Sequence, residues 1–170
     1  MSDEMKTNAD KMERLSQLIQ DIHIGMLTTA DEDGTLRSRP MAYQHPAEGF
    51  DGVIRFLTSA ASYKVAEIER KHQVNVAFSN PKSQDYVSIS GAATLSRDHA
   101  KITELWNPLY KAWFPDGLND PDIALLIIPI ERAEYWAPVN GVTVQLLGFV
   151  KSALTGAPAS GGEHEVLENR

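Results

Sequence analysis

The sequence predicts a small, mainly β barrel with flanking helices. Three observations support this fold class: seven or so runs of alternating or β-branched residues, the short turns that join them, and two helical interruptions. The chain has 170 residues, 42% hydrophobic and 23% charged, which is ordinary for a globular protein. We expect a single domain over residues 8–154 and a disordered tail over 155–170, where small and polar residues predominate.

Charge and composition argue against several classes of function. The formal net charge of −7 disfavours a sequence-independent nucleic-acid binder, because such a protein needs a clustered positive face. The chain contains no cysteine, which fits a reducing cytosol and leaves no thiolate nucleophile. It shows neither an apolar leader nor a run long enough to span a bilayer. We therefore expect a cytoplasmic protein with no nucleic-acid or membrane partner.

The first predicted elements are a helix and a hairpin. Apolar residues recur every three or four positions over 8–22, which predicts a helix with one buried face. Residues 23–30 read as a strand, D-E-D-G as a turn, and 35–43 as the returning strand. Because Pro40 has no backbone N–H to donate, this second strand is predicted at a sheet edge or at a bulge.

The middle of the chain is predicted as strands with one helix among them. We expect strands over 53–58, 74–79 and 86–95, and a helix over 62–71. Gly91, inside the last of these strands, predicts a bulge.

Helical spacing returns after the strand that ends at residue 95. Asp98 is the predicted N-cap of a helix that Pro108 interrupts, and Asn107 is the predicted cap of a second helical segment. After the turn residues P-D-G-L-N-D-P-D we expect closing strands over 123–130, 133–137 and 142–149.

A cluster of hydroxyls and one cation marks the start of the predicted helix over 62–71. The cluster consists of Thr58, Ser59, Ser62 and Lys64. Free N–H groups and the helix dipole favour an anion at such a place, and hydroxyls and an ammonium group can bind phosphate oxygens. The alternative is that Ser59 or Ser62 simply caps the helix and Lys64 lies on the surface.

Two arginines share one face of the strand over 35–43. Arg37 and Arg39 carry guanidinium groups that can bind a phosphate or carboxylate through two hydrogen bonds. Alternatively, they are exposed arginines paired with Asp31 to Asp33, and such surface pairs contribute only about 0–1 kcal/mol each.

The tryptophans suggest a planar ligand. The histidines and the absence of known catalytic motifs argue against a metal site and against several enzyme classes. Trp113 and Trp136 lie at the ends of predicted elements, where they could flank a ring, whereas Trp106 is predicted in the core. The five histidines are scattered without metal-ligand spacing, so we expect no metal site. The sequence lacks the hydrolase, Rossmann and P-loop motifs.

Several segments stand in a characteristic order: I-G-M-L-T-T, D-G-T-L-R-S-R-P-M, F-L-T-S-A-A-S-Y-K, V-S-I-S-G-A-A, W-F-P-D-G-L-N-D-P-D and A-E-Y-W. In this order they resemble the general stress protein 26 family, a branch of the pyridoxamine 5′-phosphate oxidase-like flavoproteins. The resemblance covers roughly residues 12–149. It implies a split β-barrel that forms a homodimer, with one FMN in each of two clefts between the subunits. FAD or a deazaflavin also fits a phosphate-binding turn.

The resemblance also implies roles for single residues. Arg39, Pro40 and Met41 match the strand along the flavin, and Arg37 matches it less closely. Trp136 matches the tryptophan near the isoalloxazine ring, and Trp113 belongs to the W-F-P-D-G segment. The remaining matches, to the phosphate-binding turn and helix start, are Thr58, Ser59, Ser62 and Lys64.

One departure from the family pattern bears on activity. The true oxidases carry an R-L-H segment after the E-F-W motif that grips the substrate, whereas this chain reads V-N-G-V-T-V. Without that cation and histidine, pyridoxamine phosphate oxidation is disfavoured. The resemblance then implies an FMN-dependent oxidoreductase, or a flavin-binding or storage module in stress response without turnover. It names neither catalytic residues nor the small-molecule redox partner.

Overall fold

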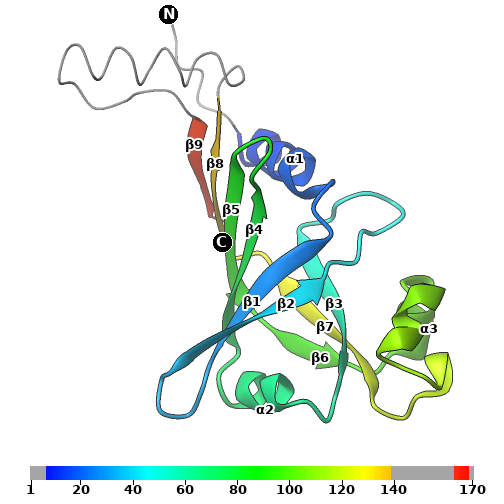
Figure 1. The fold of residues 1–170 in the computed structure, drawn as a ribbon. Coiled ribbons are helices and arrows are strands. Elements are labelled where there is room, and N and C mark those ends of the chain that lie inside the picture. Colours follow the sequence, from blue (N-terminus) through cyan, green and yellow to red (C-terminus); the bar gives the residue numbers. More distant parts are fainter. Residues whose placement is uncertain (1–6, 139–162, 169–170) are drawn as a thin grey trace, which may run out of the picture.

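Two β-sheets make up most of the protein. The computed structural model describes residues 7–138 and 163–168 (Figure 1). Within this part of the chain the larger sheet has six strands in the order β2-β1-β4-β5-β8-β9, and the smaller has three in the order β3-β7-β6. The predicted mainly β fold with flanking helices is therefore confirmed.

The larger sheet is antiparallel throughout. Its strands are β1 (Ile24–Ala30), β2 (Leu36–Ala42), β4 (Gln73–Asn80), β5 (Asp85–Ala92), β8 (Arg132–Ala137) and β9 (Glu163–Glu168). Strand β2 forms one edge of this sheet, as the missing N–H of Pro40 predicted.

The smaller sheet begins where β5 ends. Its strands are β3 (Val53–Ser59), β6 (Thr94–Ser96) and β7 (Ile123–Pro129). The predicted strand over 86–95 is divided at Ala93, where the chain passes from the larger sheet to the smaller one.

Gly91 does not form the predicted bulge. It pairs in regular register with Val74 of β4, so the prediction of a bulge is wrong. A Cβ atom at Gly91 would lie 2.1 Å from the carbonyl oxygen of Pro129, at the end of β7. Glycine is therefore required because the two sheets approach each other closely at this point.

Five helical segments flank the sheets in the described residues. They are α1 (Asn8–Ile19), α2 (Tyr63–Arg70), α3 (His99–Glu104) and the 3-10 helices η1 (Pro108–Ala112) and η2 (Gly117–Asn119). Asp98 caps α3 by accepting from two backbone N–H groups, and Asn107 caps η1, whose first residue is Pro108. Both predicted caps are confirmed. None of the helices among the described residues has the length and apolar character to span a bilayer.

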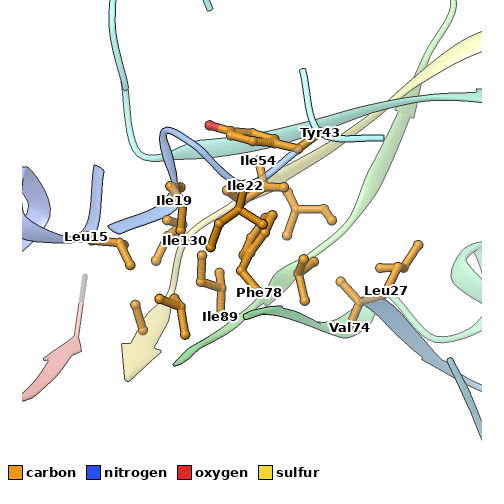
Figure 2. Close-up of a cluster of buried hydrophobic side chains, with 14 of the residues drawn as sticks. Leu15, Ile19, Ile22, Leu27, Tyr43, Ile54, Val74, Phe78, Ile89 and Ile130 are labelled. Carbon is orange, nitrogen blue, oxygen red and sulfur yellow. The ribbon is translucent and has the colours of Figure 1, made fainter. Parts of the chain in front are cut away.

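The core lies between the two sheets, and α1 packs against it (Figure 2). Buried side chains come from the larger sheet, the smaller sheet and α1, for example Phe78, Ile54 and Leu15 respectively. An isolated bridge between Tyr43 and Phe56 joins the chain after β2 to β3. The end of β2 thus lies next to β3, which positions the candidate site.

The predicted disordered tail is only partly within the described residues. Residues 163–168 form β9, which pairs with β8, so the prediction of disorder is wrong for this stretch. Leu167 of β9 is buried, and Glu165 and Glu163 on the same face of the strand pair with Lys11 and Arg14 of α1. Residues 155–162 and the predicted strand over 142–149 lie outside the described residues.

Candidate functional site

A pocket of about 460 Å³ opens where β1, β2, β3, α2 and the chain around η1 meet. Six predicted site residues line it: Pro40, Met41, Thr58, Ser59, Lys64 and Trp113. The structure therefore brings together residues that are up to 73 positions apart in the sequence, from Pro40 to Trp113. Four predicted residues lie outside its lining: Arg37, Arg39, Ser62 and Trp136.

Two buried hydroxyl groups without partners among the described residues lie where β3 leads into α2, one in the pocket lining and one just outside it. Thr58 is only 3% exposed, and its Oγ1 has no hydrogen-bond partner among the described residues. The Oγ of Ser62 is likewise buried and unpaired there, although Ser62 occupies the N-cap position of α2. The capping alternative therefore fails for Ser62, because its side chain accepts no N–H from the helix. Unpaired buried hydroxyls are costly, so these groups are expected to bond a ligand or an ordered water in the pocket region.

Lys64 supplies positive charge in the same region. It lines the pocket and forms no ion pair with any residue in the described part of the chain. Burial lowers the pKa of the Lys64 ammonium group, and the nearby positive charge of Arg39 lowers it further. Two cations close together are stabilised by an anion between or beside them.

Arg39 is held behind the pocket by a buried carboxylate. Its guanidinium donates to Oε2 of Glu67 at 3.0 Å and to Oγ1 of Thr29 at 2.6 Å. Arg37 lies further out, where it pairs with Asp31 at 3.1 Å. Its guanidinium also lies over the ring of Tyr63, 5.6 Å from the centroid. Arg37 therefore flanks the site rather than lining it.

Other parts of the pocket lining are apolar and aromatic. This apolar wall includes Pro40, Met41 and Trp113, which is 70% exposed. The segment that carries Trp113 is fixed to the barrel because the hydroxyl of Tyr110 donates to Oε1 of Gln44 at 3.0 Å. Such a wall suits a flat aromatic ring.

Trp136 lies elsewhere in the same chain. It is in β8, and β1, β4 and β5 separate β8 from β2 in the larger sheet. Its ring is 41% exposed on the face turned away from the core and stacks on His164 of β9 at 5.1 Å between centroids. A single chain thus does not bring Trp136 to the pocket.

Sequence reasoning missed four residues that shape the site: Thr29, Gln44, Glu67 and Tyr110. Alternation along β1 places Thr29 on the same inward face as Leu27, so its burial could have been inferred. Glu67 gave no comparable signal, because an acidic residue in a helix is ordinarily solvated. The described residues also contain no group of three His, Asp or Glu side chains placed to bind a metal ion.

Both a family profile and a protein of Neurospora crassa match this sequence. A family profile described as "Pyridoxamine 5'-phosphate oxidase like" matches residues 10–159. The chain is 27% identical over 159 residues to Protein bli-3 of Neurospora crassa, a match that covers 88% of this chain and 76% of that protein.

Two solved structures share the fold. The general stress FMN/FAD binding protein of Xanthomonas citri is 31% identical, with a TM-score of 0.63 and coverage of 74% of this chain and 87% of that one. General Stress Protein 26 of Bacillus anthracis is 26% identical, with a TM-score of 0.66 and coverage of 74% and 92%. The fold is thus the predicted split β-barrel, and the chain belongs to the pyridoxamine 5′-phosphate oxidase-like family.

Proposed function

We propose that the protein binds FMN in this pocket. The observation that carries the proposal is the buried hydroxyl of Thr58 together with the ammonium group of Lys64 in the pocket lining, and the buried hydroxyl of Ser62 at the adjoining start of α2. None of the three has a polar or charged partner among the described residues. These groups fit a phosphate, and the wall of Pro40, Met41 and Trp113 fits an isoalloxazine ring. The similarity to a Xanthomonas citri protein described as FMN/FAD binding supports the same assignment.

The flavin would supply the redox chemistry, and the chain would bind and orient it. A flavin-dependent oxidoreductase is the function that we favour for this site. The alternative is a flavin-binding or storage module in stress response, which the V-N-G-V-T-V stretch in place of R-L-H supports. Anaerobic mixing with NADH or NADPH tests for a nicotinamide-dependent reductase, because such an enzyme bleaches the flavin band. Steady turnover with any physiological donor and acceptor pair would rule out the storage module. A cytoplasmic location stays a prediction.

We further propose that two copies of the chain form the working unit. Ile24, Met26, Tyr86 and Trp136 are large apolar side chains exposed on the outer face of the larger sheet. The pocket reaches this face, since Ile24 is part of its lining. A second copy packed on the face would cover these side chains and could bring its own Trp136 to the pocket.

Lys64→Ala is expected to weaken FMN binding by about 1.5–3 kcal/mol, the usual value of a hydrogen bond to a charged group. Titration of flavin fluorescence with purified protein measures the change. Lys82→Ala removes an exposed lysine from the turn between β4 and β5 and serves as the matched control. If both variants bind FMN as tightly as the wild type, Lys64 does not contact the phosphate.

Met26→Arg is expected to convert the dimer to a monomer, because it places a charge on the exposed apolar face beside Ile24 and the pocket. The same change is expected to lower FMN affinity if the second copy completes the pocket. Sedimentation equilibrium measures the mass, and flavin titration measures the affinity. Leu109→Arg alters an even more exposed apolar residue, on η1, and should leave the mass unchanged. A wild-type protein that sediments as a monomer would contradict the proposal.

A further inference from the structure

Glu67 is a buried charge on the side of α2 that contacts the β1–β2 hairpin. It lies on α2, three residues after Lys64, and its side chain is fully buried. Buried carboxylates are rare unless they are paired, and here the partners come from the two strands of the β1–β2 hairpin. Figure 1 shows α2 beside this hairpin.

Three side chains form a closed triangle of hydrogen bonds between β1, β2 and α2. Arg39 donates to Thr29 Oγ1 at 2.6 Å and to Glu67 Oε2 at 3.0 Å. Thr29 Oγ1 in turn donates to the same Glu67 oxygen at 2.5 Å. Because the guanidinium is planar and two of its nitrogens are fixed, its orientation is fixed as well.

The triangle also determines where the charge of Arg39 lies. Arg39 directly precedes Pro40 of the pocket lining, and its partner Glu67 lies one turn of α2 after Lys64, so the guanidinium lies near the polar part of the pocket. The lowered pKa of Lys64, to which burial contributes most and the charge of Arg39 contributes next, agrees with this position. The two hydrogen bonds of the guanidinium in the triangle leave further N–H groups without an acceptor among the described residues. Glu67 balances the charge of Arg39, so that Lys64 supplies the net positive charge of this part.

We propose that Glu67 and Thr29 are positioning residues for recognition of a phosphomonoester. They hold Arg39 in one orientation, with its remaining N–H groups available to a phosphate bound beside Lys64. Neither residue lines the pocket, so both act through Arg39. A guanidinium fixed before the ligand arrives loses less conformational entropy on binding. This inference rests on the proposed flavin site and adds the reason why the site prefers a phosphorylated flavin.

The test compares FMN with riboflavin, which lacks the phosphate. Thr29→Val removes the hydroxyl without changing charge or shape, and Glu67→Asp keeps the charge but moves the carboxylate away from Arg39. Each is expected to raise the Kd for FMN about two- to tenfold, the effect of one hydrogen bond, and to leave the Kd for riboflavin unchanged. Thr29→Ser retains the hydroxyl and should restore the wild-type ratio of the two Kd values.

Thr28→Val is the matched control. It removes a hydroxyl hydrogen bond to Ser38, which also joins β1 to β2 but lies on the opposite face of the sheet from Thr29. It should leave the ratio unchanged. If Thr29→Val and Glu67→Asp shift both Kd values equally or shift neither, the two residues are only structural and the inference is wrong. A wild-type protein that binds neither FMN nor riboflavin overturns the proposed function, and this inference falls with it.

Discussion

Replacing Arg39 with methionine is expected to lower the free energy of unfolding by about 3 kcal/mol, because it leaves the buried carboxylate of Glu67 without its main partner. The value is at the lower end for a broken buried ion pair, since Arg37 Nε lies 3.7 Å from Glu67 Oε1 and can compensate in part. Urea unfolding followed by tryptophan fluorescence, without added flavin, measures this change.

A second substitution separates the ion pair from general packing. Arg39→Met combined with Glu67→Leu removes both charges, and the double variant is expected to recover most of the lost stability. Arg37→Met, which removes a more exposed arginine from the same strand, should cost about 1 kcal/mol or less. If Arg39→Met is as mild as Arg37→Met, Glu67 does not depend on Arg39 and the triangle contributes little to the fold.

Gly91→Ala is expected to destabilise the protein by about 3 kcal/mol or more, at the upper end for overpacking, because the new Cβ would clash with a backbone oxygen. The carbonyl of Pro129 belongs to β7 and cannot rotate away as a flexible side chain could. Relief requires β5 and β7 to separate at the place where the two sheets meet. The midpoint and slope of the urea unfolding curve measure the change.

The neighbouring residue provides a control for Gly91→Ala. Ser90→Ala in the same strand removes only a long hydrogen bond, 3.3 Å from Asn75, and should change stability by about 0.5 kcal/mol or less. Equal stability of the two variants would show that β5 has room at Gly91 and that the close approach to Pro129 is not a constraint.

Local signals predicted most of the fold. The strands were predicted from alternation and turn residues, and one sheet edge from the missing N–H of Pro40. The caps Asp98 and Asn107 were predicted because capping depends on adjacent residues only. The role of Gly91 was misinterpreted because glycine is required there by the close approach of Pro129, a residue far along the chain. Strand β9 was not predicted because its sequence is mostly polar. It is extended because it pairs with β8, and local sequence does not show this pairing.

The candidate site was predictable where its residues are close in sequence. Thr58, Ser59 and Lys64 lie around one strand-to-helix turn and line the pocket, and the structure brings Pro40, Met41 and Trp113 to the same pocket. The triangle of Arg39, Thr29 and Glu67 was not predictable, because it depends on how α2 packs on the β1–β2 hairpin. The proposed role of Trp136 needs a second chain, and no single-chain pattern can test it.

The most direct test of the flavin proposal is the absorption spectrum of the purified protein, followed by titration with FMN and mass analysis of any released ligand. If FMN binds in this pocket, the protein is yellow, or it is colourless and quenches added FMN fluorescence with one flavin bound per chain, and any released ligand has the mass of FMN. A colourless protein that leaves FMN fluorescence unchanged would contradict it.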